Sequence, residues 1–383
     1  MQIPLFKIYW DNNDIEQVTS VIKKGGYWAI GPEIKEFEKR CAEYVGVKYA
    51  LALNSGTSAL HTVLAAHGIG KGDEVIVPAF TFIATANSVL LVGAKPVFAE
   101  IEGETYGLDP ADVEKKITPR TKAIMPVHYG GLSCRIKELK QIADKHKLLL
   151  IEDAAESLGA TVNGQKICSI GDSAILSFCS PKVITMGEGG MIFTNSRDVF
   201  EKSKLIYNHG RVETSDYFSS TEQMEYVMLG YNFRMSTMTA ALGISQLEKI
   251  DRVIQMRREN ASYLTKKLSP IKEIKTPTEP AGYLHLYQMY TIRLNAGDGV
   301  RDRLKDYLNK SGIGTKIYFD PVHLSLFYRR DHGHKVGELP VTEGLSRKVL
   351  TLPMFPTLTK EEMDYMADKI KEFFSTNPVK PVK

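Results

Sequence analysis

The chain has 383 residues, of which 43% are hydrophobic and 25% are charged. This is the composition of an ordinary globular protein, and it excludes a disordered or fibrous chain. Because 49 basic and 45 acidic side chains leave a formal charge of only +4, with no long basic run, the charge balance predicts no nucleic acid partner.

The N-terminal segment and one long uncharged segment predict a protein that does not span a membrane. Lys7 and Asp11 stand where a signal peptide would have an apolar stretch. Residues 75–94 carry no charge, but Pro78 interrupts them. A buried strand, a turn and a half-buried helix explain this segment better than a transmembrane helix does. Its polar residues are Thr81, Thr85, Asn87 and Ser88.

The cysteines predict a reducing environment. They lie far apart in the chain and none belongs to a CxxC motif. They are Cys41, Cys134, Cys168 and Cys179. This spacing is not that of a disulfide framework, so we expect reduced, mostly buried thiols in a cytoplasmic protein.

Short apolar runs alternate with amphipathic stretches over residues 48–195. Helical patterns lie between several of the runs, for example at 57–68 and 136–147. This alternation predicts an α/β fold with a mostly parallel sheet that helices cover on both faces. The predicted strands are 48–53, 74–78, 95–101, 121–127, 148–153, 173–178 and 191–195.

The last third of the chain predicts a smaller α+β unit. A long helical pattern over residues 235–268 leads into it. We therefore predict a large α/β domain over residues 1–250 and a small domain over residues 251–383, with a frayed tail at 375–383. The small domain should contain a strand at 287–294 and helices at 300–312 and 360–374.

Polar, glycine-rich and aromatic residues follow several of the predicted strands. In open α/β sheets, ligands bind beyond the carboxyl ends of the strands, so these residues predict a ligand site at one edge of the sheet. The segments are Ser55-Gly56-Thr57-Ser58, Ala79-Phe80-Thr81-Phe82, His128-Tyr129-Gly130-Gly131, Asp153-Ala154-Ala155-Glu156 and Cys179-Ser180-Pro181-Lys182.

The residue types at this edge suit a pyridoxal phosphate site. Residues 55–58 would open a helix and suit a phosphate, although an ordinary N-cap would use the same residues. Asp153 and Glu156 supply acids, which a purely structural role would explain equally well. Lys182 beside an acid and a phosphate cradle suggests a Schiff base. Phe82 would stack on the pyridine ring, unless it is simply a core residue.

Two further motifs do not predict a binding site in their sequence context. Gly68-x-Gly70-x-Gly72 follows a helix and precedes a strand, which is the wrong order for a dinucleotide fingerprint. His332-x-His334 lacks further ligands nearby, so we expect no metal site. The sequence contains no HExxH, P-loop or GxSxG motif.

Seven segments together resemble the DegT/StrS group of sugar-nucleotide aminotransferases. The resemblance covers the chain from Ile3 to about Phe374. It implies a fold of type I of the pyridoxal-phosphate-dependent transferases, with a seven-stranded, mostly parallel sheet. It also implies a homodimer whose active sites are shared between the subunits. The segments are GPEIKEFE (31–38), NSGTSALH (54–61), GDEVIVPAFTFIATAN (72–87), ITPRTKAIMPVHYGG (117–131), IEDAAESLGA (151–160), SFCSPKVITMGEGGM (177–191) and GYNFRMS (230–236).

The resemblance implies roles for the residues that contact the cofactor ring. Lys182 matches the catalytic lysine that forms a Schiff base with pyridoxal 5′-phosphate. Asp153 matches the acid that pairs with the pyridine nitrogen. Glu156, where many relatives have Gln or His, would lie near the 3-oxygen of the cofactor. Phe82 would stack on the ring.

The resemblance also assigns the phosphate and substrate contacts. Gly56, Thr57 and Ser177 would hold the phosphate, and Asn232 would reach it from the partner subunit. Two C-terminal residues match positions that approach the sugar nucleotide, namely Tyr318 and His323. The segment before the lysine departs from the SFN or SFH of many relatives, because it contains Cys179 and Pro181.

The implied reaction transfers the amino group of glutamate to a nucleotide-linked keto-deoxysugar, a 4-keto-6-deoxyhexose. The product would be an amino sugar for surface polysaccharide or glycoconjugate biosynthesis. Amination at carbon 3 stays open, as does the choice among GDP, UDP and dTDP.

Two alternatives remain at this point. One is another pyridoxal-phosphate reaction, a lyase or a sugar dehydratase, although Lys182 argues against those dehydratases in which histidine replaces the lysine. The other is a non-catalytic regulatory relative. A regulator would not need Asp153, Ser177 and Lys182 together, and the sequence has no evident helix-turn-helix.

Overall fold

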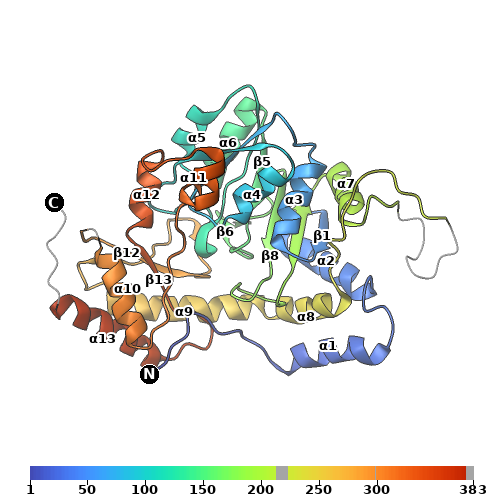
Figure 1. Ribbon diagram of the computed structural model, residues 1–383. Coiled ribbons are helices and arrows are strands. Elements are labelled where there is room, and N and C mark those ends of the chain that lie inside the picture. Colours follow the sequence, from blue (N-terminus) through green and yellow to red (C-terminus); the bar gives the residue numbers. More distant parts are fainter. Residues whose placement is uncertain (213–222, 298, 377–383) are drawn as a thin grey trace.

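The computed structural model describes residues 1–212, 223–297 and 299–376, and its centre is a seven-stranded sheet (Figure 1). The strands of this sheet are β1 (Tyr49–Leu53), β2 (Glu74–Pro78), β3 (Lys95–Ala99), β4 (Thr121–Ile124), β5 (Leu149–Asp153), β8 (Ser173–Ser177) and β9 (Gly190–Thr194). Their order across the sheet is β1-β9-β8-β5-β4-β2-β3. All neighbours from β8 to β3 are parallel, whereas β9 runs antiparallel to both β1 and β8.

The seven strands predicted from the sequence are confirmed, and so is the mostly parallel sheet. The predicted strand at 121–127 is shorter than expected, because β4 ends at Ile124. Beyond it, Val127 pairs with Asp153 only as an isolated bridge. Pro126 lies in the segment between the end of β4 and Val127, and it has no N–H group to donate to the sheet. Its carbonyl still accepts the N–H of Asp153 at 2.9 Å.

Helices cover both faces of the sheet, as the uniformly apolar strands require. Neighbouring residues of β5 show the two faces, because Ile151 packs into one core cluster and Leu150 into another. On the Ile151 face lie α3 (Gly56–Ala66), α4 (Ala84–Leu91) and α7 (Arg197–Tyr207). On the opposite face lie α2 (Pro32–Val45), α5 (Pro110–Lys116), α6 (Ile136–His146) and α8 (Thr237–Glu248).

The long helical pattern over residues 235–268 forms two helices rather than one. They are α8 and α9 (Ile250–Leu268), which adjoin at Lys249 and run along the lower side of the molecule (Figure 1). The first part of α9, with Val253, packs in the core beside the large sheet, whereas Leu264 packs in a separate C-terminal core. One helix therefore contributes to both cores, and the division of the chain near residue 250 stays a prediction.

The C-terminal core surrounds a small antiparallel sheet, in the order β10-β12-β13. Its elements are β10 (Ile274–Lys275), β12 (Tyr290–Leu294), β13 (Val349–Leu352), α10 (Val300–Lys310) and α13 (Lys360–Thr376). Thus α10 and α13 confirm the helices predicted at 300–312 and 360–374, and β12 confirms the strand within 287–294. The expected tail is wrong at its start, because Ser375 and Thr376 complete α13, and residues 377–383 lie outside the described residues.

The N-terminus packs with the C-terminal core, which the sequence did not predict. Ile3 is 1% exposed and donates its N–H to the carbonyl of Gly312 at 2.8 Å. The N–H of Gly314 in turn donates to the carbonyl of Ile3, also at 2.8 Å. The first residues of the chain therefore belong with the C-terminal core, although we placed them in the large domain.

Shorter elements complete the described chain. A second small sheet has the order β11-β6-β7. No helix among the described residues is long and apolar enough to cross a membrane. The remaining elements are α1 (Asn12–Lys24), η1 (Tyr129–Gly131), β6 (Thr161–Val162), β7 (Gln165–Lys166), β11 (Tyr283–Leu284), η2 (Val322–Leu324), α11 (Leu326–His332) and α12 (Pro340–Ser346).

Candidate active site

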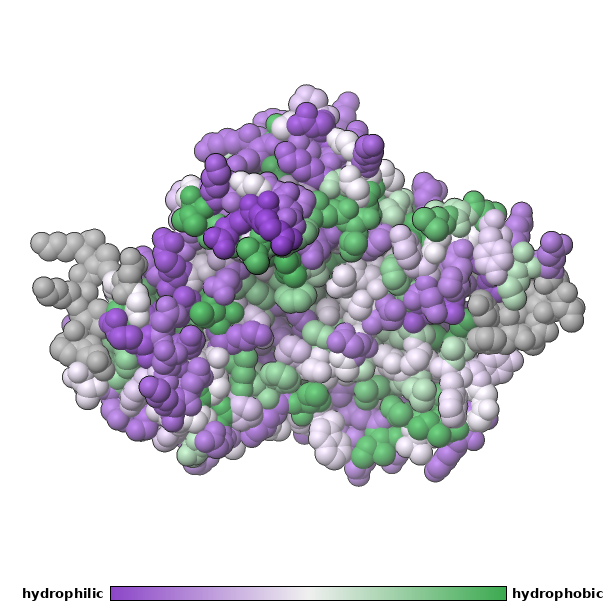
Figure 2. Space-filling model, in the orientation of Figure 1, coloured by the Kyte–Doolittle hydropathy of each residue, from purple (hydrophilic) through white to green (hydrophobic). Residues whose placement is uncertain are grey.

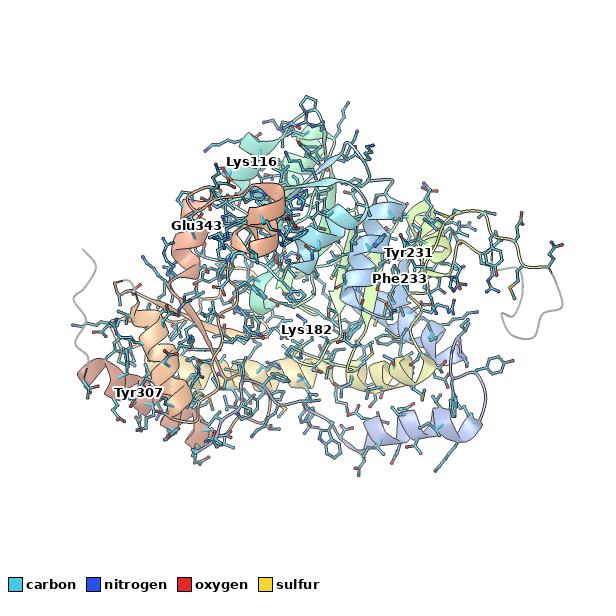
Figure 3. All side chains as sticks on the ribbon, viewed as in Figure 1. Lys116, Lys182, Tyr231, Phe233, Tyr307 and Glu343 are labelled. Carbon is cyan, nitrogen blue, oxygen red and sulfur yellow. The ribbon has the colours of Figure 1, made fainter. Side chains whose placement is uncertain are left out.

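The site lies at the carboxyl edge of the parallel strands. Asp153 ends β5, Ser177 ends β8, and Gly56 begins the helix that follows β1. Because these three strands run in the same direction, their last residues meet at one edge of the sheet. Figure 3 shows Lys182 near this edge, between the sheet and the helices α8 and α9.

The carboxylate of Asp153 is almost completely buried. Its Oδ2 accepts the hydroxyl of Thr85 at 2.8 Å, and its Oδ1 accepts the N–H of Ala155 at 3.2 Å. Burial raises the pKa of Asp153, although these hydrogen bonds and the nearby charge of Lys182 oppose the rise. Within the described residues, no ion pair joins the carboxylate of Asp153 to a cation, so its ionised form is held without a directly paired charge.

Thr85 connects Asp153 to Phe82. The N–H of Thr85 donates to the carbonyl of Phe82 at 3.2 Å, within the turn that begins α4. Phe82 itself is 62% exposed, so its role as a core residue is excluded. An exposed aromatic ring one turn away from the residue that holds Asp153 is suited to stacking on a planar ligand.

Lys182 faces a second acid. Its Nζ donates to Oε1 of Glu156 at 3.4 Å, and the N–H of Gly130 donates to Oε2 of the same carboxylate at 2.9 Å. The side chain of Lys182 is only 14% exposed, so its amine lies inside the site rather than in bulk water. The structure thus brings together Lys182, Glu156 and Asp153, as the sequence predicted.

Gly56 and Ser177 form a narrow cradle at the beginning of α3. A Cβ atom on Gly56 would lie 2.9 Å from the Cβ of Ser177, so only glycine permits this approach. Ser55 accepts hydrogen bonds from two N–H groups of the first turn. Its Oγ accepts the N–H of Ser58, and its carbonyl accepts the N–H of Ala59. Among the described residues, no acceptor faces the N–H groups of Gly56 and Thr57, which suits an anion at this helix start.

A buried pair supports the site from the opposite face of the sheet. His128 and Glu152 are fully buried, and His128 Nε2 lies 2.9 Å from Glu152 Oε2. His128 Nδ1 accepts the N–H of Cys134 at 3.2 Å, so the proton is on Nε2 and is donated to Glu152. Burial favours a raised pKa for Glu152, but His128 and backbone N–H groups, including that of Cys168, hold this pKa below its usual value.

The pair also fixes the backbone around Asp153. The N–H of His128 donates to the carbonyl of Asp153 at 3.0 Å, and Ser157 Oγ donates to the carbonyl of His128 at 2.8 Å. The turn from Asp153 to Ser157 is therefore tied to His128 at both ends, and Glu156 lies within this turn.

Tyr318 approaches the site from the C-terminal part of the chain. Burial raises its pKa, and the charges of Glu156 and Cys179 raise it further. Tyr129 fixes the backbone here, because its hydroxyl donates to the carbonyl of Tyr318 at 2.6 Å. The substrate contact expected for Tyr318 from the sequence stays a prediction.

His323 is not brought to the site. Its side chain is 0% exposed, and its Nε2 lies 3.2 Å from Oε1 of Glu343. Glu343 also accepts the N–H of Gly337 at 2.8 Å, so His323 helps to hold a neighbouring loop. The contact between His323 and a substrate therefore stays a prediction, and in this structure the His323 ring is buried.

Asn232 lies closer to its own phosphate cradle than the sequence indicated. Its carbonyl accepts Nδ2 of Asn54 at 3.4 Å, and the carbonyl of Phe233 accepts the N–H of Asn54 at 2.8 Å. Asn54 precedes Gly56 by only two residues, so the backbone of Asn232 lies beside that cradle. Its side chain is exposed, and its contact with the partner subunit's cofactor stays a prediction.

Comparison with known proteins fits this arrangement. The sequence model of the DegT/DnrJ/EryC1/StrS aminotransferase family matches residues 9–371. The chain belongs to this family. The match includes Asp153, Glu156, Ser177 and Lys182, which the structure places at one edge of the sheet.

Relatives and solved structures match the chain over almost its full length. The GDP-perosamine synthase of Caulobacter vibrioides is 39% identical, over 92% of this chain and 93% of that protein. A UDP-N-acetyl-3-dehydro-alpha-D-glucosamine 3-aminotransferase of Acidithiobacillus ferrooxidans is 38% identical, over 89% of each. A putative sugar aminotransferase of Streptococcus pneumoniae, solved in its PMP form, superposes with a TM-score of 0.93 at 26% identity and covers 98% of each chain.

The residues at this edge fit pyridoxal 5′-phosphate, the cofactor of the family. A Cβ on Gly56 would fill the cradle, which lies at a helix start where no acceptor among the described residues faces the N–H groups of Gly56 and Thr57. The buried acid of Asp153 suits a protonated ring nitrogen, and the amine of Lys182 suits an aldehyde. The structure also confirms the fold class, since its neighbours are aminotransferases of this kind.

Sequence reasoning did not assign the contacts that support these residues. Thr85, which bonds Asp153, belongs to the uncharged segment 75–94, where its polarity was the available signal. Gly130, whose N–H bonds Glu156, belongs to the VHYGG run at the end of β4. Gln288, whose Nε2 donates to the carbonyl of Pro181 beside the lysine, had no local signal, because a long-range fold places it there.

We predict that Asp153→Asn stabilises the cofactor-free protein at neutral pH. The folded state raises the pKa of Asp153 above its unfolded value of about 3.9, so it holds this proton more tightly than the unfolded state. The stabilising contribution of Asp153 is therefore present below about pH 4 and is lost as the pH rises through the folded-state pKa. Denaturant unfolding of the cofactor-free parent and variant between about pH 4 and 8 measures the difference.

The control is Asp368→Asn, which changes an exposed carboxylate 3.7 Å from Lys371 on α13. Surface pairs of this kind contribute only about 0–1 kcal/mol, so the control should unfold almost like the parent. A parent that is more stable than Asp153→Asn at neutral pH would contradict this account of the site.

Proposed function

We propose that this protein is a pyridoxal-phosphate-dependent aminotransferase that moves the amino group of glutamate to a nucleotide-linked keto-deoxysugar. The observation that carries the proposal is the half-buried amine of Lys182, 3.4 Å from Glu156, at the sheet edge that also carries the acid of Asp153 and the cradle of Gly56 and Ser177. The names of the relatives, which include GDP-perosamine synthases, support a sugar nucleotide as acceptor.

Each residue then has a defined role. Gly56, Thr57 and Ser177 hold the cofactor phosphate, and Phe82 stacks on its ring. Asp153 accepts the hydrogen bond of the protonated ring nitrogen, and the positive charge there compensates its buried carboxylate.

Glu156 and Tyr318 complete the proposed site. Glu156 lies near the 3-oxygen of the cofactor and orients the lysine amine. Tyr318 is proposed as a substrate contact, as the resemblance implies, and the charge of Glu156 contributes to the raised pKa of its phenol.

Lys182 is the acid–base group of the reaction. When bound, pyridoxal phosphate supplies an aldehyde that takes up an amino group and a ring that accepts the electron pair left at the substrate α-carbon. The Lys182 amine removes the proton from the α-carbon of glutamate, which leaves as 2-oxoglutarate. In the second half-reaction the same amine delivers a proton to the former keto carbon of the sugar, which becomes the aminated carbon. The two half-reactions predict ping-pong kinetics.

The acceptor sugar is proposed as a 4-keto-6-deoxyhexose, for an amino sugar of a surface polysaccharide or glycoconjugate. The identity of 39% and 36% to two GDP-perosamine synthases supports this choice. The second candidate is amination at carbon 3, which the name of the 38% identical relative from Acidithiobacillus ferrooxidans supports.

We further propose a cytoplasmic homodimer with shared active sites. Exposed apolar residues gather in the segment before Asn232, where Leu229 is 80% exposed, and a second subunit would cover them. A cytoplasmic location is supported by four free cysteines, of which three are buried. The exposed residues of this segment are Met224, Tyr226, Val227, Met228, Leu229 and Tyr231.

Replacement of Lys182 tests the proposed function. Lys182→Ala should abolish turnover, with a loss of at least about 1,000-fold, because both proton transfers lose their carrier. The matched variant is Lys182→Arg, which keeps a positive charge beside Glu156 but cannot serve as this base. Both should retain the parental fold by circular dichroism, and neither should release 2-oxoglutarate from glutamate. Sustained transamination by either purified variant would rule out the role of Lys182.

A mixed dimer tests whether Asn232 serves the partner subunit. Neither Lys182→Ala nor Asn232→Ala alone should have appreciable activity. If Asn232 acts across the interface, a dimer of the two variant chains contains one doubly altered site and one intact site. Activity should therefore return after the chains exchange, to about half of the parental value per mixed dimer. Chains that exchange without regaining activity would place Asn232 in its own subunit's site.

A further inference from the structure

Two buried hydroxyl groups form a chain that ends on Asp153. The hydroxyl of Thr85 donates to Oδ2 of Asp153 at 2.8 Å, and the hydroxyl of Thr81 lies 2.8 Å from that of Thr85. Thr81 is 3% exposed and Thr85 is 1% exposed, so bulk water has little access to these hydrogen bonds. The three side chains therefore form one connected polar network inside the protein.

The two threonines do not serve as caps of the helix at which they lie. Threonine is common at helix starts, because its hydroxyl can accept a backbone N–H of the first turn. At the start of α4, however, Ile83 occupies the cap position, and no side chain of the described residues makes a cap hydrogen bond there. A role in starting the helix therefore does not explain the hydroxyl groups of Thr81 and Thr85.

The charge of Asp153 sets the direction of this hydroxyl chain. An ionised carboxylate only accepts hydrogen bonds, so Thr85 gives its single hydroxyl hydrogen to Asp153. Thr81 must then donate to Thr85, whose hydrogen is already used. Each donor polarises the next, so the chain that runs from Thr81 through Thr85 stabilises the ionised form of the acid.

The hydroxyl of Thr85 is the main group that offsets the burial of Asp153. Burial raises the pKa of Asp153, and the Thr85 hydroxyl lowers this pKa more than the charge of Lys182 does. The charge of Glu156 raises the pKa. The thiol of Cys168, which is also near Asp153, stays neutral because burial raises its own pKa well above the usual value. The ionised state of Asp153 therefore depends strongly on an uncharged donor.

The outer end of the hydroxyl chain lies at the wall of a cavity. Thr81 and Phe82 both line this cavity, whose volume is about 510 Å³. Figure 2 shows hydrophobic residues gathered below the polar tip formed by α11, where the surface is hollowed. Thr85 separates Thr81 from Asp153, so a change at Thr81 tests the chain without removing a contact to the acid.

We infer that Thr81 and Thr85 are positioning residues, which hold Asp153 in its ionised form and thereby keep a shared proton on the ring nitrogen of the cofactor. The inference rests on the proposed function and adds the groups that decide where this proton lies. A single proton between Asp153 and the ring nitrogen goes to the stronger base. Hydrogen bonds to the carboxylate weaken it as a base, so the proton stays on the nitrogen and the ring accepts electrons more readily.

Nitrogen NMR of the full-length protein tests the inference. The protein is loaded with pyridoxal phosphate whose ring nitrogen is a heavy isotope, because protonated and neutral ring nitrogens differ in chemical shift. Thr85→Val keeps the shape of the side chain but removes the hydroxyl. The ratio of ring-protonated to Asp153-protonated forms should fall by about 10- to 100-fold, the loss expected for one hydrogen bond to a charged group. The signal should therefore move towards that of neutral pyridine, and Thr85→Ser should restore the parental signal.

Ser88→Ala is the matched control. Ser88 is 0% exposed, and its hydroxyl donates to the carbonyl of Thr85 at 2.9 Å. The control thus also loses a buried hydrogen bond on α4, but no contact in the chain to Asp153, and its nitrogen signal should be that of the parent. Thr81→Val should move the signal in the same direction as Thr85→Val but less far, because Thr81 acts through Thr85.

The inference would be overturned by a parental nitrogen signal in Thr85→Val, or by an equal shift in Thr85→Val and Thr85→Ser. If Thr85→Val does not fold, a parental signal in Thr81→Val would overturn it. Glutamate separates these results from the proposed function. Loaded parent protein whose absorbance does not respond to glutamate would contradict the proposed function, whereas the nitrogen signal without glutamate still decides on the hydroxyl chain.

Discussion

The buried carboxylate of Asp153 is the interaction on which the rest of the site depends. Its burial raises its pKa, and the hydrogen bonds from Thr85 and Ala155 only partly offset the loss of water. A cationic ligand at this position would remove the imbalance, so the structure is prepared for a group with a protonated ring nitrogen. In a protein that bound no cationic ligand here, a buried carboxylate such as that of Asp153 would contribute little to stability.

The parallel sheet places the other groups around this acid. Because β1, β5 and β8 end at the same edge, the cradle of Gly56 and Ser177 meets the turn that carries Asp153 and Glu156. The buried His128 fixes that turn from the opposite face, at the carbonyl of Asp153 and through Ser157. The loop that follows β8 then brings the amine of Lys182 to Glu156, at 3.4 Å.

The sequence was sufficient for those features that depend on local patterns. Each predicted strand was an apolar run bounded by polar or glycine residues; Asp153 ends one such run, and Lys182 follows another by four residues. Features that depend on distant contacts had no local signal, including the packing of Ile3 against the C-terminal core and the burial of His323 against Glu343. The break between α8 and α9 was hidden in the same way, because both helices share one apolar pattern across Lys249.

The central claim is that nitrogen passes from glutamate to a sugar that is linked to a nucleotide. The direct measurement supplies glutamate whose amino nitrogen is a heavy isotope, together with GDP-, UDP- and dTDP-linked keto-sugars, and locates the label by NMR. The account predicts that the label appears on carbon 4 of a 6-deoxyhexose, with one 2-oxoglutarate formed for each amino sugar. Release of 2-oxoglutarate without label in any sugar, or a deoxygenated sugar that contains no nitrogen, would contradict it.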